Sequence, residues 1–178
     1  MNEIISNGKE VIRIEAEAIA DLQNSINEDF VNTVETIFTS KGRVVLTGMG
    51  KSGLIARKIV ATLNSTGTAA IYLHPTDALH GDLGMVRSED VVILISKSGE
   101  TEEISNLLPM LKRMNVKLIS MCGNKESKLA RECDLFLNIA VKEEACPYDL
   151  APTASTTATL ALGDALAVSL LKKRNFTA

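Results

Sequence analysis

Arg43-Val44-Val45-Leu46-Thr47-Gly48-Met49-Gly50-Lys51-Ser52-Gly53, residues 43–53, joins a short β-branched run to a turn rich in glycine. A buried parallel strand is typically an apolar run of this kind that ends in glycines. The residues that follow, about 52–65, predict a helix. This strand, turn and helix together indicate the fold class of the rest of the chain.

Strands and helices are expected to alternate from this point onward. The further strands expected from apolar runs are 69–73, 91–95, 117–121 and 135–139, and the further helices are 102–114, 126–132 and 152–174. Alternation at this spacing implies right-handed crossovers between parallel strands, with helices on both faces of the sheet. The sequence therefore predicts an α/β fold over residues 43–174: a three-layer α-β-α sandwich with a five-stranded parallel sheet, flavodoxin- or Rossmann-like.

Residues 1–40 form a predicted helical arm before the first strand. Apolar residues recur at three- and four-residue spacing from Ile4 to Phe38, and Asn24 or Asn27 is expected to divide the arm into two helices. The apolar stripe is wide for one packing face, so we expect it to pack against another subunit as well as its own core. Cover within the chain alone is the alternative. A length of 178 residues favours one domain, 1–178.

The composition argues against a nucleic-acid or anionic membrane surface. The net charge is −3, there is no Trp, and aromatic residues make up 3% of the chain. Such a chain has neither a broad basic field nor aromatic platforms on which bases stack. A bound phosphate would have to be held locally, by loops and helix ends.

The cysteines and the N-terminus predict a cytoplasmic location. Cys122, Cys133 and Cys146 form no CxxC pair, and an odd count without a secretory signal indicates a reducing compartment. The first residues lack a basic region followed by an apolar stretch. No apolar run is expected to reach the ~18 residues of a membrane span.

Residues 48–53 satisfy the dinucleotide-binding pattern GxGxxG. A Rossmann site also needs an acid at the end of the second strand to hold the ribose, but the chain there has Tyr72-Leu73-His74-Pro75. A P-loop needs a glycine at position 45, where the chain has Val45. A nicotinamide or flavin site is therefore disfavoured, and a Walker A site is excluded.

A sugar-phosphate loop is the interpretation that best fits the same residues. Gly50 lets the backbone approach a ligand closely, and Ser52 lies at a helix start whose N–H groups favour an anion. Lys51 adds a positive charge. A tight structural turn with an incidental lysine is the alternative.

Residues 96–101, Ser-Lys-Ser-Gly-Glu-Thr, follow the most apolar strand and open the next helix. The hydroxyls of Ser96, Ser98 and Thr101, together with N-terminal amides, form a phosphate cradle that needs little net charge. A polar turn with an N-cap would explain the loop if it stood alone. Ligands of open parallel sheets bind beyond the carboxyl ends of the strands, so we expect both loops to meet there.

The loop at 96–101 resembles the signature of the sugar isomerase (SIS) domain. Four more segments resemble the D-arabinose-5-phosphate isomerases, in a form lacking CBS domains: Gly48-Met49-Gly50-Lys51-Ser52-Gly53, His74-Pro75-Thr76-Asp77-Ala78-Leu79-His80-Gly81-Asp82-Leu83-Gly84, Glu144-Ala145-Cys146-Pro147 and Leu150-Ala151-Pro152-Thr153-Ala154-Ser155-Thr156-Thr157. The resemblance spans nearly the whole chain. It implies interconversion of D-ribulose 5-phosphate and D-arabinose 5-phosphate, which supplies synthesis of Kdo, a sugar of bacterial lipopolysaccharide and some capsules.

Isomerisation of an aldose to a ketose moves a proton between C1 and C2 through an enediol. It needs a base at carbon and an acid–base group at the oxygens, and it needs no metal or organic cofactor if protein donors stabilise the enediolate. The candidates are Lys51, His80, Glu103 and Glu144, the same positions that the resemblance singles out. We assign proton transfer to Glu144 or His80, electrostatic stabilisation to Lys51 and orientation to Glu103, whose alternative role is to complement the helix dipole.

Nearby residues have more open roles. His74 either contributes to the site or turns the chain before Pro75. Cys146 is interpreted as a small loop residue, because the reaction needs no nucleophile. Ser155, Thr156 and Thr157 are expected either to cap the last helix or to face the ligand.

The resemblance also has departures. Relatives often carry CBS domains, and a Ser-His-Pro-Gly segment just beyond the last helix whose histidine reaches the site of a neighbouring subunit. Neither is present before Ala178, so this is either a stand-alone or a shortened form. Lys97 stands where relatives often have Asn or Gln. The resemblance implies a homo-oligomer, a tetramer made of two dimers.

Three other functions remain as alternatives. A non-catalytic sugar-phosphate sensor would need the phosphate contacts but no acid–base pair. An isomerase for another sugar phosphate would share the loops and differ in pocket length. An NAD-dependent dehydrogenase would be stabilised by NAD, which we do not expect.

Overall fold

The computed structural model describes residues 2–177, which fold around a sheet of five parallel strands. The strands are β1 (Val44–Gly48), β2 (Ala70–Tyr72), β3 (Val91–Ser96), β4 (Lys117–Cys122) and β5 (Leu135–Asn138). Their order across the sheet is β2-β1-β3-β4-β5, and every neighbouring pair is parallel. The chain therefore builds the sheet outward in one direction from β1 to β2, and then in the other direction from β3. The predicted α/β class is confirmed.

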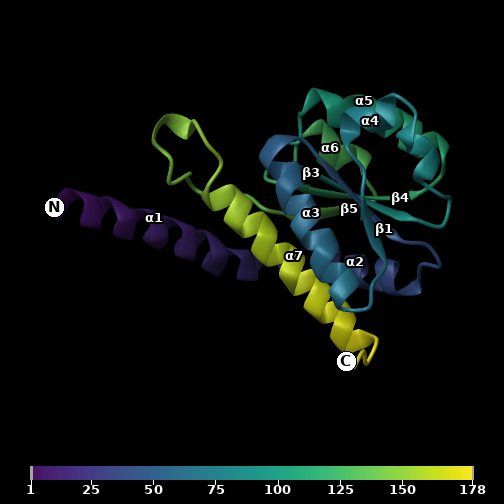
Figure 1. Cartoon of the computed structure of the whole chain (residues 1–178), viewed down its shortest axis with the longest axis horizontal. Helices are drawn as coiled ribbons and strands as arrows, with labels where there is room; N and C mark the ends of the chain where they lie inside the picture. Colours follow the sequence, from purple (N-terminus) through teal and green to yellow (C-terminus); the bar gives the residue numbers. More distant parts are fainter. Residues whose placement is uncertain (1, 178) are drawn as a thin grey trace.

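Helices cover both faces of this sheet, which confirms the predicted three layers (Figure 1). One face is covered by α2 (Glu28–Thr39), α3 (Gly50–Ser65) and α7 (Ala154–Lys173), and the other by α4 (Pro75–Leu79), α5 (Glu102–Arg113) and α6 (Lys128–Glu132). Side chains alternate along a strand, so Leu46 joins the first core and Val45 the second. All of β3 is buried, which is why its sequence is apolar without alternation.

The N-terminal region divides into two parts with different surroundings. Helix α1 (Asn2–Asp21) projects beyond the rest of the molecule and crosses α7, as Figure 1 shows. Ala18 is its buried residue among those described, whereas α2 contributes Phe30, Val34 and Ile37 to the core. The predicted break falls at Asn27, whose side chain accepts hydrogen bonds from the first-turn amides of α2, after a 3₁₀ turn, η1 (Leu22–Ser25).

Helix α7 qualifies the expectation that no apolar run is long enough to span a membrane. By length and composition Ala154–Lys173 is long enough and apolar enough to do so. Half of the residues in its most apolar stretch are buried, and the helix packs on α1, α2 and α3. Gly163 permits the close approach to α3, because a Cβ there would overlap the Ile59 side chain. The apolar composition of α7 is that of a core helix.

Several boundaries differ from the predicted ones for local reasons. The segment after β2, for which the sequence predicts no helix, contains α4, with Pro75 in its first turn, and a 3₁₀ turn, η2 (Asp82–Met85). Helix α6 begins two residues later than expected, because the Ser127 side chain caps it by accepting from the Ala130 amide. Helix α3 begins two residues earlier than expected, at Gly50. Helix α7 begins two residues later than expected, at Ala154.

Candidate functional site

The register of the sheet brings the glycine loop (residues 48–53) and the serine loop (residues 96–101) together. In the β1–β3 pair, Gly48 lies opposite Ile95, so the two loops leave neighbouring strands at the same level. On the other side of β1, Leu46 pairs with Tyr72, which places the segment beginning at His74 at the same edge. The chain changes its direction of growth between β1 and β3, and this is where open α/β sheets bind ligands.

The glycine loop has a backbone conformation that needs its glycines. Gly50 has a φ of 53°, in the left-handed region, and a Cβ on it would meet no atom within 4 Å. A Cβ on Gly53 would lie 2.6 Å from the Gly48 carbonyl oxygen and 2.7 Å from the Tyr72 hydroxyl. That hydroxyl donates to the Gly48 carbonyl at 2.7 Å and so holds the loop from β2. The Tyr72 hydrogen bond fixes the turn on the side of β2, and the space beside Gly50 is open.

The serine loop is organised by its own hydroxyls. The Oγ atoms of Ser96 and Thr101 are 2.7 Å apart, and Ser96 Oγ also accepts from the Gly99 amide at 3.0 Å. The exposed Ser98 accepts from the Glu100 amide at 3.1 Å. Gly99 has a φ of 73°, and a Cβ there would overlap Ser127 Oγ. Ser96 and Thr101 therefore shape the loop, while Ser98 faces solvent.

Helices α3 and α5 begin at these loops with their first-turn amides uncapped by side chains. Met49 and Thr101 are the two N-cap residues, and neither side chain accepts a hydrogen bond from the helix. Asn27 and Ser127, by contrast, cap α2 and α6. An N-cap role therefore does not explain the serine loop. Two sets of unpaired N–H groups at this edge favour an anion.

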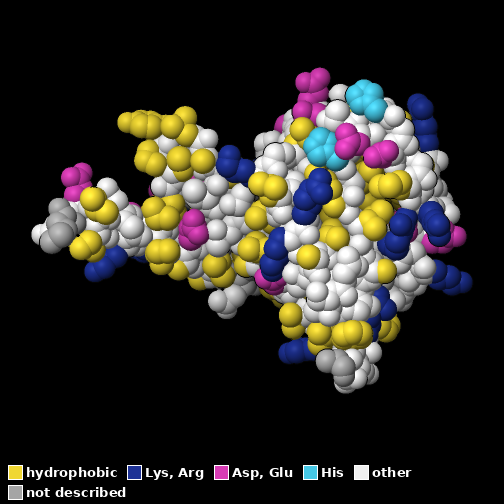
Figure 2. Space-filling model, in the orientation of Figure 1, with side chains coloured by type: hydrophobic (Ala, Val, Ile, Leu, Met, Phe, Trp, Pro, Cys, Tyr) yellow, Lys and Arg dark blue, Asp and Glu magenta, His cyan; other side chains and the backbone are white. Residues whose placement is uncertain are grey.

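The remaining predicted residues lie around this edge with different exposure. Lys51 is exposed in the first turn of α3, Glu103 is half-buried in the first turn of α5, and His80 is exposed at the end of α4. His74 starts α4, and its Nδ1 is buried, 3.8 Å from an Asp77 carboxylate oxygen. Both histidines are visible on one face of the molecule in Figure 2.

Glu144 is the most connected of the predicted site residues. Its Oε2 accepts hydrogen bonds from the Thr153 amide at 2.8 Å, the Thr153 hydroxyl at 3.1 Å and the Ser155 amide at 3.1 Å. Its Oε1 lies 2.8 Å from Lys97 Nζ. The carboxylate thus caps the start of α7 and joins it to the serine loop.

This environment keeps Glu144 ionised. Burial alone would raise the pKa of its carboxyl, but Lys97 and the hydrogen bonds from Ser155 and Thr153 outweigh burial and lower the pKa from 4.5 to about 2. A carboxylate with so low a pKa is a weak base. As long as Lys97 stays beside it, Glu144 is better suited to organising the site than to removing a proton.

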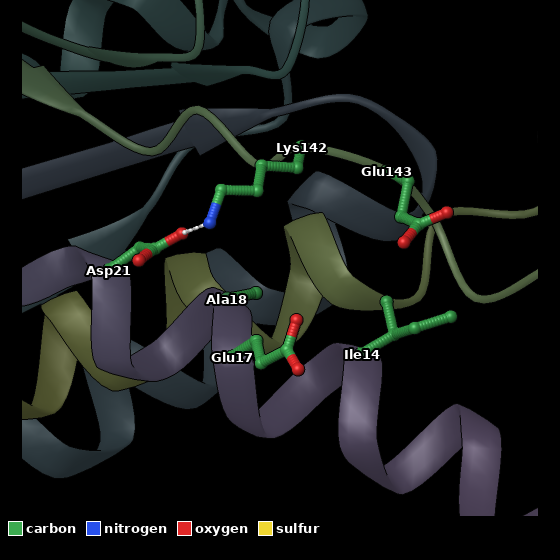
Figure 3. A pocket seen from close by; sticks show the side chains of 6 residues that line it. All are labelled: Ile14, Glu17, Ala18, Asp21, Lys142 and Glu143. Atoms are coloured by element: carbon green, nitrogen blue, oxygen red, sulfur yellow. Dashed lines mark ion pairs between the residues drawn. The ribbon is translucent and has the colours of Figure 1, made fainter.

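The loop that carries Glu144, residues 142–153, also contacts the arm. Lys142 Nζ lies 2.8 Å from Asp21 Oδ2, beside a cavity of about 20 Å³, and Figure 3 shows Glu143 turned away from this pair. The Thr157 hydroxyl donates to Glu15 of α1 at 2.8 Å. Thr157 therefore does not cap α7, and its hydroxyl is engaged by α1. Ser155 contributes its amide to Glu144, and the Thr156 hydroxyl donates back to the Thr153 carbonyl at 2.8 Å.

A surface hollow of about 400 Å³ lies at the opposite edge of the sheet, bordered by Ser40, Glu89 and Lys117. That edge carries the amino ends of β3 and β4, and its lining lacks the glycine and serine loops. We therefore place the candidate site at the carboxyl edge rather than in this hollow.

Residues 37–169 match the family model of the SIS domain. The chain belongs to the SIS domain family.

Within that family, the chain is similar to the arabinose 5-phosphate isomerase KdsD of Escherichia coli K12, with 57% identity over 171 residues, covering 96% of this chain and 52% of that protein. The arabinose 5-phosphate isomerase KdsD of Pseudomonas aeruginosa is 51% identical over 176 residues, covering 99% of this chain and 54% of that protein. The chain thus spans about half the length of the curated relatives it matches. A solved structure from E. coli CFT073, in complex with arabinose 5-phosphate, has a TM-score of 0.95 and 45% identity, and the match covers 99% of this chain and 94% of that one.

Sequence reasoning missed two contacts that organise the site. Tyr72 holds the glycine loop, and Lys97 pairs with Glu144 although 47 positions separate them. Lys97 is noticeable in the sequence because it lies between two serines, but its partner Glu144 cannot be predicted. The loop after β5, which carries Glu144, passes back across the sheet edge to reach Lys97.

Proposed function

We propose that this chain is an aldose–ketose isomerase that interconverts D-arabinose 5-phosphate and D-ribulose 5-phosphate. The observation that carries the proposal is the convergence of the glycine and serine loops at the switch point of the sheet, with a buried carboxylate paired to one of them. Similarity to arabinose 5-phosphate isomerases and to a protein solved with arabinose 5-phosphate supports this choice of substrate.

The phosphate is proposed to bind between the two loops. Gly50 and Ser52 offer backbone amides at the start of α3, and Ser98 offers an exposed hydroxyl. Ser96 and Thr101 contribute by shaping the serine loop around the start of α5. Uncapped helix starts and hydroxyls hold a phosphate without a strongly basic surface, in agreement with the net charge of −3.

The chemistry is a proton transfer within the open-chain sugar. A base removes the proton from C2, the C–H electron pair forms the C1=C2 double bond, and the carbonyl oxygen on C1 gains a proton to give the enediol. The hydroxyl on C2 then loses its proton and C1 gains one, which gives the ketose. Atoms and electrons balance within the substrate, so the step as written needs no oxidant, metal or coenzyme.

The roles follow from what each group offers. Glu144 or His80 transfers the proton at carbon, Lys51 stabilises the charge that develops on oxygen, and Glu103 orients the substrate. Lys51 is exposed and can turn toward a ligand, and Glu103 lies in the first turn of the helix that begins at the serine loop.

The proposal is tested by mixing the purified chain with D-arabinose 5-phosphate and following D-ribulose 5-phosphate by NMR. We expect conversion, and a loss of about 10²-fold or more in kcat for His80→Ala, the size typical of an acid–base group. Glu103→Gln should lower kcat by a smaller factor, because it removes a group that orients the substrate. Glu102→Gln, at the exposed neighbouring position, is the matched control. Binding of the sugar phosphate without conversion would instead identify a sensor.

We also propose that the chain forms a homo-oligomer, a tetramer of two dimers. Ile4 and Ile12 on α1 are 78% and 68% exposed, and Tyr148 and Leu150 on the neighbouring loop are 93% and 79% exposed. Hydrophobic side chains gather on this projecting part of the molecule in Figure 2. Exposed apolar surface of this kind supports burial against another copy. Light scattering should give four chains per particle, and Ile12→Lys should reduce that number; a monomeric wild type would contradict the proposal.

The wider setting is proposed on the same basis. The chain acts as one domain over residues 1–178 in the cytoplasm, supplies Kdo synthesis, and has neither nucleic acid nor a membrane as a partner. Deletion of its gene should deplete Kdo in whole cells, and unchanged Kdo would contradict the assignment.

A further inference from the structure

Lys97 lies between Ser96 and Ser98, and its ammonium group forms an ion pair with the carboxylate of Glu144, which belongs to another loop. Its Nζ lies 2.8 Å from Glu144 Oε1. The lysine side chain is 47% exposed, whereas the Glu144 side chain is 1% exposed. The pair therefore joins a cation that reaches solvent to an anion that does not.

The two oxygens of Glu144 have different partners. Oε2 accepts from Thr153 and Ser155, as described above. Oε1 is buried and accepts no well-aligned hydrogen bond from the described residues. Among residues 2–177, Lys97 is the charged group that forms an ion pair with Oε1, and the side chains in the first turn of α7 are neutral. The charge of Oε1 is thus balanced by one half-exposed lysine side chain.

A sugar phosphate would bring a second and stronger anion to the same lysine. A phosphate monoester carries about −1.5 to −2 charges at neutral pH, and a carboxylate carries one. The four-carbon stem of lysine lets its ammonium change direction at little cost. Lys97 lies within the serine loop, so it needs to turn but not to cross the site.

We propose that Lys97 is a positioning residue that exchanges partners: it neutralises Glu144 in the empty site and moves to the phosphate of the bound sugar, leaving Oε1 of Glu144 free to accept a proton. This inference rests on the proposed function, because it requires a phosphate at the serine loop. The exchange of partners accounts for the low basicity of Glu144 in the empty site. Removal of an opposite charge makes a carboxylate more basic, so the base becomes competent only when substrate is in place.

The exchange makes Glu144 and the phosphate competitors for one cation. Loss of the Glu144 charge should therefore tighten phosphate binding, whereas a substitution that merely disrupted the site would weaken it. Loss of Lys97 should weaken it. Without Lys97 there is nothing to compete for, so the charge of Glu144 should then have little influence on affinity.

Calorimetric titration with D-arabinose 5-phosphate tests this competition. We expect Glu144→Gln to bind about three- to tenfold more tightly, Lys97→Gln to bind more weakly by a similar factor, and the double variant to match Lys97→Gln. Lys142→Gln is the matched control, because Lys142 makes the other ion pair of this loop, 2.8 Å from Asp21, and should bind as wild type does. Unchanged or weaker binding by Glu144→Gln, with a wild type that binds, overturns the inference alone. A wild type that does not bind overturns the proposed function and the inference with it.

A second measurement does not depend on Glu144→Gln folding. The pH profile of kcat/KM reports the free enzyme and the free substrate, and the profile of kcat reports the complex. The free sugar phosphate titrates at about pH 6 with either protein, so each profile of the variant is divided by that of wild type, which cancels the substrate's titration. In Lys97→Gln we expect the acid limb of kcat/KM to move about 1–2 pH units higher than in wild type, while the acid limb of kcat stays in place. Equal movement of both limbs would mean that Lys97 remains on Glu144 in the complex, and movement of neither would mean that the pair has no influence on the base. Either result overturns the exchange.

Discussion

Replacing Glu144 by Gln should remove part of the acid sensitivity of the fold. The folded pKa of this carboxyl is about 2, against an ordinary 4.5. A difference of about 2.5 in pKa corresponds to about 3 kcal/mol of stability at neutral pH. That figure is an upper bound, because Lys97 is 47% exposed and solvent weakens its side of the ion pair. We expect Glu144→Gln to be about 1–2 kcal/mol less stable than wild type at pH 7.

The sign of the pH dependence follows from the lowered pKa. The contribution of Glu144 is complete above the unfolded pKa, and it is lost as the pH falls from about 4.5 toward about 2. Glutamine does not titrate, so the two proteins should converge in stability over this window. Urea unfolding followed by circular dichroism at several pH values between about 7 and 3 measures the convergence. Glu143→Gln, at the exposed neighbouring position, should behave as wild type does. A stability difference that stays constant with pH, or none at pH 7, would refute the assigned geometry.

Three further predictions concern other residues. Gly99→Ala should lower the free energy of unfolding by about 1–3 kcal/mol, because φ at this position is 73° and a Cβ would overlap Ser127 Oγ; urea unfolding measures it, and an unchanged value would contradict the loop geometry. Asp90→Asn should lower the free energy of unfolding by about 1–3 kcal/mol at pH 7. Burial would raise the pKa of Asp90, but the amides of Arg43 and Arg87 and the Arg43 guanidinium lower it, so the lost stability should shrink as the pH falls below the ordinary carboxyl range. A loss of stability that does not change with pH would argue against these contacts. Partial burial raises the pKa of the Cys133 thiol to about 12, so iodoacetamide should modify Cys133 at least tenfold more slowly in the folded chain than in the unfolded chain at pH 8. Mass spectrometry measures both rates, and equal rates would contradict the partial burial of this thiol.

The layers of the fold were predictable because the strands carry their signal locally. β1 and β3 are buried on both faces, and a strand in that position has to be a short, continuous apolar run. The short helix α4 was missed, because its five residues, Pro75–Leu79, contain too little periodicity to separate a helix from a turn. The start of α7 was placed two residues too early, because Pro152 suits a first turn but the cap of this helix comes from Glu144.

The candidate site was predictable in its loops but not in its contacts. Glycines and hydroxyls after adjacent strands indicate a phosphate site, since parallel strands deliver their loops to one edge. The partner of Lys97 is set by how a later loop crosses that edge, which is a tertiary feature without a local signal. Thr157 was expected to cap α7 or to face the ligand, and it instead binds Glu15 of a helix far away in sequence.

The central claim is that a base at the carboxyl edge of the sheet moves a proton of the sugar phosphate through an enediol. The most direct test is to incubate the chain with D-arabinose 5-phosphate in D₂O and follow deuterium by NMR and mass spectrometry. The account predicts D-ribulose 5-phosphate with deuterium on C1, recovered D-arabinose 5-phosphate with deuterium on C2, and loss of both in His80→Ala. Absence of product, or product formed without deuterium and at an unchanged rate in His80→Ala, would contradict it.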